Sequence, residues 1–90
     1  MKKKIAILGS TGSIGITTLN IIKKDKKNFD IYLLTTNRKA LKIFRQSKEF
    51  NVKNVIITNK QKCLKWKKTF AKNKINLYNN FENFNKFNIR

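Results

Sequence analysis

Apolar residues recur along the chain in short runs that alternate between the spacing of a strand and that of a helix. The first run, residues 4–8 (KIAIL), is continuous and ends at Gly9, which is typical of a strand buried on both faces of a parallel sheet. From Ser13 the spacing becomes helical, and one stripe of this predicted helix carries Ile14, Thr18, Leu19 and Ile22. Two lysines then fall in its last turn, where cations favour the helix dipole.

The same alternation continues to the end of the chain. Further strands are predicted at 30–35, 52–58 and 75–78, with helices over 40–50 and from about Lys60, where Cys63, Trp66 and Phe70 share one face. In the tail, phenylalanines at 81, 84 and 87 have a spacing that permits a helical turn. The order β-α-β-α-β-α-β predicts an α/β fold, the first half of a Rossmann-type doubly wound parallel sheet.

The length of the chain limits how many strands this domain can contain. A complete dinucleotide-binding fold has six strands, and 90 residues hold about half of it. We therefore expect residues 1–90 to be one partial NADP-binding Rossmann domain and part of a longer protein.

The charge balance is strongly basic, with 22 Lys and Arg residues against 4 acids and a formal net charge of +18. Such a charge repels itself and makes nucleic acid an obvious candidate partner. The lysines are scattered in broken runs, however, and do not form one arginine-rich stripe, so we favour a solvated basic surface over a nucleic-acid footprint.

The single cysteine, Cys63, excludes an internal disulfide framework and fits a reducing cytoplasm. The apolar run after the N-terminal lysines is too short for a signal sequence or a membrane span. These features predict a soluble cytoplasmic protein with no membrane partner.

The glycine-rich turn after the first strand carries the functional signal. Gly9, Gly12 and Gly15 lie between a buried strand and a helix, which aims backbone N–H groups and the positive end of the helix dipole at one point. Gly9 would permit the sharp turn, Gly12 would let a pyrophosphate approach the main chain, and Gly15 would let the helix pack closely. An ordinary strand-to-helix turn needs one glycine only, so three favour a dinucleotide.

The hydroxyls of Ser10, Thr11 and Ser13 can also donate to phosphate oxygens, although Ser13 can instead cap the helix. A Walker loop is excluded, because no GK[ST] sequence follows Gly15.

The choice of nucleotide is set at the end of the second strand, where NAD enzymes place an acid against the ribose. This chain has Asn37, Arg38 and Lys39 there, and Asp30 lies at the wrong end of the strand. Two cations without an acid favour the 2′-phosphate of NADP. The other interpretation is that both are ordinary surface cations.

The segments KKIAILGSTGSIG, with TL two residues later, and NFDIYLLTTN resemble the N-terminal domain of 1-deoxy-D-xylulose 5-phosphate reductoisomerases, closely from Lys3 to about Thr58. The resemblance implies cofactor contacts at Thr11, Gly12, Ser13 and Ile14 and at Asn37, Arg38 and Lys39. The family usually has glycine, lysine and asparagine at the last three positions. Asn37 tolerates a positive φ in place of glycine, and Arg38 keeps the cation.

By this resemblance, the chain is expected to be the NADPH-binding N-terminal fragment of an oxidoreductase of non-mevalonate isoprenoid biosynthesis. Such an enzyme isomerises and reduces the phosphorylated substrate 1-deoxy-D-xylulose 5-phosphate to 2-C-methyl-D-erythritol 4-phosphate. The resemblance also implies a homodimer and Mg²⁺ or Mn²⁺ held by carboxylates. The acids of this chain match none of those ligand motifs, so we assign no catalytic or metal-binding residue and expect the 90 residues alone to be inactive.

Two alternatives stay open at this point. One is a fragment of another NADP-dependent reductase that shares the turn. The other is a small basic nucleic-acid-binding protein whose lysines contact phosphates and whose Trp66, Phe81 and Phe84 stack on bases.

Overall fold

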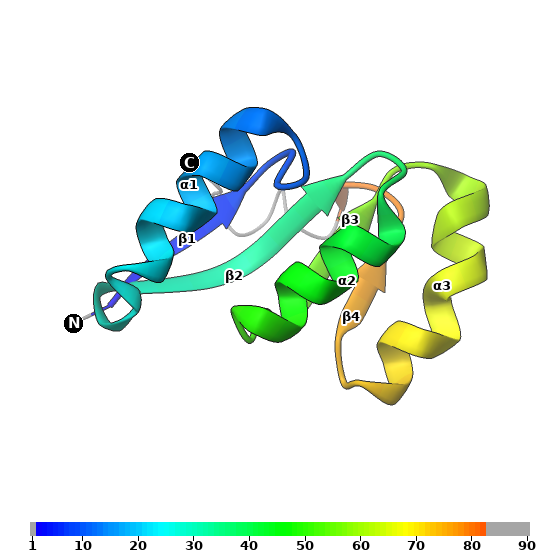
Figure 1. Ribbon diagram of the computed structural model, residues 1–90. Helices are drawn as coiled ribbons and strands as arrows, with labels where there is room; N and C mark the ends of the chain where they lie inside the picture. The colour runs from blue at the N-terminus through cyan, green and yellow to red at the C-terminus, as the bar shows by residue number, and fades with distance from the viewer. Residues whose placement is uncertain (1, 83–90) are drawn as a thin grey trace.

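The computed structural model of the protein describes residues 2–82. Strands and helices alternate along this part of the chain (Figure 1). The elements are β1 (Lys3–Ile7), α1 (Ser13–Lys23), the 3₁₀ helix η1 (Lys26–Asn28), β2 (Phe29–Thr36), α2 (Ala40–Glu49), β3 (Asn54–Ile57), α3 (Lys60–Lys72) and β4 (Asn76–Tyr78). The predicted α/β order is confirmed, with strand ends that move by one or two residues.

The four strands form one parallel sheet in the order β1-β2-β3-β4. Each strand lies beside the strand that precedes it in the sequence, so β4 extends the sheet beyond β3. The six-stranded Rossmann order instead returns the fourth strand to the side of the first. In this sheet β1 and β4 are both edge strands.

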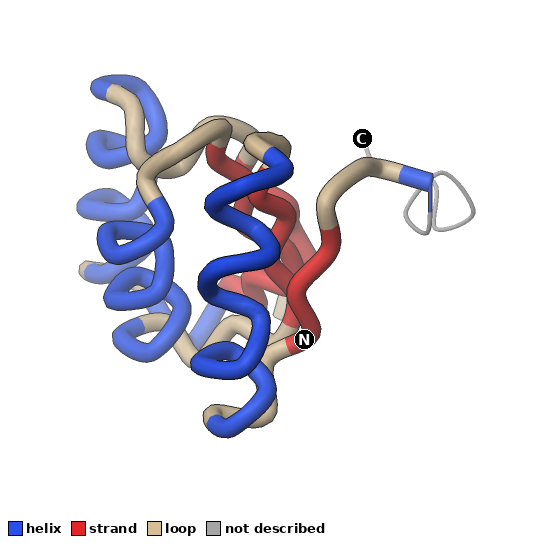
Figure 2. Tube along the Cα trace, turned by 90° about the vertical axis from the view of Figure 1, so that its right-hand side faces the viewer, coloured by secondary structure: helices blue, strands red, loops and turns tan. Residues whose placement is uncertain are grey.

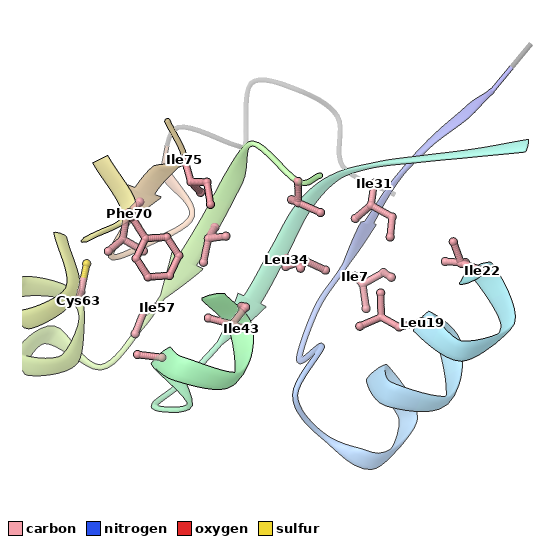
Figure 3. Close-up of a cluster of buried hydrophobic side chains, with 14 residues drawn as sticks. Ile7, Leu19, Ile22, Ile31, Leu34, Ile43, Ile57, Cys63, Phe70 and Ile75 are labelled. Carbon is pink, nitrogen blue, oxygen red and sulfur yellow. The ribbon is translucent and has the colours of Figure 1, made fainter. Parts of the chain in front are cut away.

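The helices α1, α2 and α3 lie on one face of this sheet, as Figure 2 shows. This follows from right-handed crossovers that step along the sheet in one direction. The core fills the space between helices and sheet (Figure 3), and its buried side chains include Ile7, Leu19, Ile22, Leu34, Ile43, Ile57, Cys63 and Phe70. Cys63 and Phe70 therefore share the buried face of α3 as predicted, and Trp66 packs half-buried against the same core.

A smaller apolar cluster covers the second face of the sheet. Leu33 and Ile56 are fully buried there, and the partly buried residues that pack against them are Ala6, Tyr32, Tyr78 and Phe81. A register shift between β1 and β2 makes Ile5 pair with Ile31 and Ala6 with Leu33, so Tyr32 is the extra residue of a bulge. The alternation of side chains is interrupted there, and the consecutive residues Tyr32 and Leu33 both contact the smaller cluster.

The prediction that residues 4–8 are buried on both faces was wrong for most of the run. Ile7 is buried, but Ile5 and Ala6 are only half-buried, and Leu8 is 57% exposed and follows the strand. The physical reason is the position of β1 at the edge of a sheet whose helices, among residues 2–82, all lie on one face.

The predicted stripe of α1 also needs a correction. Ile14 is 84% exposed, and the buried face of the helix consists of Gly15, Leu19 and Ile22. Gly15 occupies the inward position one residue after Ile14, because the helix begins too close to the preceding turn for a side chain there.

Helix ends follow local rules that the apolar pattern does not reveal. Asn59 caps α3 by accepting a hydrogen bond from the Lys62 amide at 3.0 Å. Asn51 and Lys74, which follow α2 and α3, adopt φ values of 56° and 59°. No helix in the described part of the chain is both long and apolar enough to cross a bilayer. The expected helical turn of the tail involves Phe84 and Phe87, which lie outside the described residues.

Candidate functional site

The turn between β1 and α1 is built on its three glycines, each in a different way. Gly9 has a φ of +70°, a backbone conformation that residues other than glycine rarely adopt. The Gly12 amide donates to the Gly9 carbonyl at 3.1 Å and closes the turn. A Cβ on Gly15 would overlap the Gly9 carbonyl oxygen and lie 2.5 Å from the Cα of Ser10. The helix therefore starts directly against the turn.

Gly12 differs from the other two, because the protein itself leaves room for a side chain there. Its φ of −84° and ψ of 175° suit any residue. A Cβ would meet nothing closer than the Gly9 carbonyl oxygen at 3.5 Å, an ordinary contact. The space beside Gly12 is open to solvent, as close approach by an anion requires.

The start of α1 presents unpaired amides. Gly12 is the N-cap and supplies no side-chain hydrogen bond, so the expectation that Ser13 could be the cap was wrong, because Ser13 is already the first helical residue. Within residues 2–82, no acceptor pairs with the backbone N–H groups of Thr11, Ser13 and Ile14. Such donors at the positive end of a helix dipole are an arrangement that favours an anion.

The hydroxyls of the turn have separate surroundings. Ser10 is fully buried and its Oγ donates to Gln46 Oε1 at 2.8 Å, so the expectation that it faces a phosphate was wrong. Thr11 Oγ1 lies 2.7 Å from Thr36 Oγ1, and one of these two hydroxyls donates to the other. Ser13 is exposed, and its hydroxyl makes no hydrogen bond within residues 2–82.

The end of β2 holds the turn in place. The Gly9 amide donates to Thr35 Oγ1, and the Ser10 amide donates to the Thr35 carbonyl oxygen, both at 2.9 Å. Thr35 and Thr36 are 5% exposed, although both are polar. We did not single out either residue from the sequence, where their signal is a pair of hydroxyls at the end of an apolar strand.

The loop after β2 begins at the same edge of the sheet. Asn37 accepts a hydrogen bond from the Thr58 hydroxyl through Oδ1 at 2.9 Å, and its carbonyl accepts one from the Asn59 amide at 2.8 Å. Its φ is not positive, so the left-handed conformation that asparagine tolerates is not used. Arg38 and Lys39 are exposed, and among the described residues no acid pairs with either.

The two predicted clusters therefore meet. Thr11 of the turn contacts Thr36, which directly precedes the loop of Asn37, Arg38 and Lys39. Carboxyl ends of neighbouring parallel strands form the crevice where α/β proteins bind nucleotides. Contacts of these side chains with a cofactor stay a prediction.

A groove of about 860 Å³ behind this edge is lined by α1 and α2, and by residues of α3 that include Trp66. Arg38, Lys39 and Ile16 line the end nearest the turn, and the opposite end is crossed by an ion pair of 2.8 Å between Lys23 and Glu49. Both partners of this pair are substantially exposed, so its contribution to stability is small, about 1 kcal/mol or less.

The acids of the chain do not converge. In residues 2–82, no three Asp, Glu, His or Cys side chains come close enough together to hold a metal ion. Glu49 is engaged with Lys23.

Comparison with known proteins identifies relatives of one kind. The family model described as 1-deoxy-D-xylulose 5-phosphate reductoisomerase matches residues 5–86, so the likeness extends well past Thr58, where we expected it to fade. The reductoisomerase of Pelagibacter ubique is 52% identical over 84 residues, which cover 93% of this chain and 22% of that protein. The enzyme of Porphyromonas gingivalis is 53% identical over 62 residues, or 69% of this chain and 16% of the relative.

Solved structures agree with this result. The reductoisomerase of Zymomonas mobilis in complex with NADPH superposes with a TM-score of 0.80 at 26% identity, covering 87% of this chain and 21% of that one. A second reductoisomerase, in complex with NADPH, fosmidomycin and magnesium, has the same fold, with a TM-score of 0.78 at 24% identity over 84% of this chain and 19% of its own.

The chain spans about a fifth of the length of these relatives. The family model covers nearly all of the sequence, and the three glycines of the turn and the whole of α1 lie inside the match. This chain belongs to the 1-deoxy-D-xylulose 5-phosphate reductoisomerase family.

Proposed function

We propose that this chain binds NADPH and forms the cofactor-binding part of a 1-deoxy-D-xylulose 5-phosphate reductoisomerase. The observation that carries the proposal is that, among residues 2–82, nothing pairs with the amides of Thr11, Ser13 and Ile14. In the same part of the chain, no acid pairs with the cations of Arg38 and Lys39. One edge of the sheet thus offers two anion sites, which suits a dinucleotide that carries a pyrophosphate and a separate 2′-phosphate.

The turn would hold the pyrophosphate. The amides of Thr11, Ser13 and Ile14 donate to its oxygens, and the missing side chain of Gly12 lets it approach the backbone. The exposed Ser13 hydroxyl adds a donor, and Thr11 adds a second one when Thr36 donates to it.

The loop after β2 would hold the 2′-phosphate. The Arg38 guanidinium presents several donors in a plane that matches phosphate geometry, and Lys39 adds a second positive charge. Asn37 contributes through its side-chain NH₂ group, because its Oδ1 is engaged with Thr58. With no acid at this position, NADH would lack the acceptor that a ribose diol needs.

The activity belongs to the longer protein in this proposal. Bound NADPH supplies the hydride by which such an enzyme reduces the rearranged 1-deoxy-D-xylulose 5-phosphate to 2-C-methyl-D-erythritol 4-phosphate. The Mg²⁺ or Mn²⁺ ligands would come from outside residues 2–82, since the acids of that segment do not converge. We place the enzyme in the cytoplasm as a homodimer, and the unpaired Cys63 fits a reducing compartment.

An isothermal calorimetric titration of the 90-residue chain with NADPH tests this proposal. We expect saturable binding of one NADPH per chain that is lost in Gly12→Val, because the valine side chain would occupy the phosphate position. Circular dichroism confirms that the variant is folded. Binding of DNA or RNA that is steeply salt-dependent and survives Gly12→Val, without NADPH binding, would contradict the proposal.

A further inference from the structure

We propose that Gln46 is a positioning residue that aims the Thr11 amide at the anion site, an inference that rests on the proposed NADPH binding. Gln46 lies in α2, 36 residues after Ser10. Its Oε1 accepts from Ser10 Oγ at 2.8 Å, and its Nε2 donates to the Ser10 carbonyl oxygen at 2.9 Å. Both halves of one side-chain amide thus bind a single buried residue.

Ser10 is held by every polar group it has. Its amide donates to the Thr35 carbonyl, and its hydroxyl and carbonyl both bond to Gln46. The residue is fully buried, so water does not compete for these groups. The backbone at Ser10 is therefore fixed between β2 on one side and α2 on the other.

The geometry of the peptide bond carries this constraint to the binding site. The Ser10 carbonyl and the Thr11 amide belong to the same planar unit, which is trans here, so they point in opposite directions. Because Gln46 binds the carbonyl from the side of α2, the Thr11 N–H points away from α2. In this structure that N–H is one of the unpaired donors at the start of α1.

The same helix also carries the second anion site. Lys39 is the N-cap of α2, and its carbonyl accepts from the Ile43 amide at 3.0 Å. Gln46 lies two turns farther along, so α2 connects the loop of Arg38 and Lys39 rigidly to the turn of Ser10 and Thr11. The Gln46 bonds thereby set the spacing between the pyrophosphate and 2′-phosphate positions.

Only a side chain with a donor and an acceptor at this length makes both bonds. Methionine has a similar shape but no strong donor or acceptor, and glutamate keeps the acceptor but does not donate to the Ser10 carbonyl. Ser10→Ala removes the hydroxyl bond and leaves the Gln46 bond to the carbonyl in place. The two changes at Gln46 remove the hydrogen bond that orients the peptide plane, whereas Ser10→Ala removes a buried hydrogen bond and leaves that plane held. Comparing them therefore distinguishes the two effects on NADPH affinity.

The test compares two ligands on the 90-residue chain. NADPH occupies both anion sites, whereas adenosine 2′-monophosphate carries the 2′-phosphate without the pyrophosphate. We expect Gln46→Met and Gln46→Glu to weaken NADPH about tenfold, the effect of losing an orienting hydrogen bond, with adenosine 2′-monophosphate changed less than about twofold. Ser10→Ala should weaken NADPH by no more than about threefold.

The matched control is Gln61→Met, the same change at an exposed residue of α3 that makes no side-chain hydrogen bond among the described residues. It should leave both affinities unchanged. Unaltered NADPH affinity in Gln46→Met would overturn the proposal. So would equal weakening of both ligands, which indicates general loosening, or a loss in Ser10→Ala as large as in Gln46→Met.

A readout without ligand separates this inference from NADPH binding itself. In Gln46→Met the Ser10 amide should exchange with solvent at least about tenfold faster, while the amide of Ile56 in the central strand β3 exchanges as before. Unchanged exchange at Ser10, or equal acceleration at Ile56, would overturn the positioning role. If the unmodified chain binds no NADPH, the proposed function fails, and amide exchange still decides whether Gln46 orients the turn.

Discussion

The Cα of Gly15 lies against the carbonyl oxygen of Gly9, so closely that a Cβ on Gly15 would overlap that oxygen. Six residues apart in the sequence, these two glycines let α1 begin directly on the turn that leaves β1. Gly12 lies between them with open space around its Cα. One glycine motif thus combines residues that the fold requires with one, Gly12, where the fold itself leaves room for a side chain.

Substitution at these positions should separate stability from binding. Gly15→Ala forces a backbone shift and should lower the free energy of unfolding by roughly 2–3 kcal/mol. Gly12→Ala should lower it by about 1 kcal/mol or less, the difference between glycine and alanine at an N-cap, yet weaken NADPH by about tenfold or more. Urea denaturation and an NADPH titration give both quantities.

The contrast between the two variants decides this prediction. Equal destabilisation by Gly12→Ala and Gly15→Ala would contradict the presence of space for a Cβ at Gly12. NADPH affinity unaltered in a folded Gly12→Ala variant would mean that no phosphate approaches the backbone there.

Lys74 offers a test of backbone strain away from the site. It follows α3 with a φ of 59°, and the Ile75 amide behind it donates to the Phe70 carbonyl at 3.0 Å. Glycine adopts this left-handed conformation without strain, so Lys74→Gly should raise the free energy of unfolding by about 1 kcal/mol.

Lys74→Ala is the matched control, because it removes the same charge and keeps the Cβ. It should give little of the gain. If both variants stabilise the protein alike in thermal denaturation, relief of charge repulsion and not backbone conformation is the cause.

Cys63 predicts a pH dependence of stability. Burial raises the pKa of its thiol above the ordinary 9.0, and the nearby Lys67 cation offsets part of this rise. The thiol of the unfolded chain then ionises first as the pH rises. The stability that the buried, neutral Cys63 thiol contributes to the folded protein is therefore complete below pH 9.0. This stability is lost as the pH rises from there through the higher folded-state pKa.

The comparison with Cys63→Ala isolates this effect, because the lysines titrate in both proteins. The stability difference between the unmodified chain and the variant should shrink between neutral pH and the range above pH 9.0 in denaturant titrations. A constant difference across that range would contradict the raised pKa.

Much of the fold could be predicted from local patterns. Short segments rich in apolar residues predicted the four strands, and the helical spacing of Cys63 and Phe70 placed the buried face of α3. Ile14 was misplaced because apolarity alone does not reveal that the inward position at the start of α1 must be a glycine. The burial of β1 was overestimated because a sequence does not reveal which strand lies at the sheet edge.

Features of the candidate site that arise from the local backbone could be predicted from the sequence. Features that arise from the packing of distant segments could not. The unpaired amides of Thr11, Ser13 and Ile14 follow from a glycine turn that enters a helix. The bond between Ser10 and Gln46 joins residues 36 positions apart, and it directs the serine hydroxyl inward, away from the expected phosphate. No local pattern specifies such a pair, because it exists only after α2 packs beside the turn.

The proposed binding of NADPH is tested most directly by the affinities of NADPH and NADH for the 90-residue chain, its Arg38→Met variant and the control Arg45→Met. Arg45 is an exposed arginine of α2, so its loss changes net charge equally. We expect tighter binding of NADPH than of NADH, a preference that Arg38→Met reduces about tenfold and Arg45→Met preserves. Equal affinity for the two nucleotides, or an undiminished preference in Arg38→Met, would contradict this expectation.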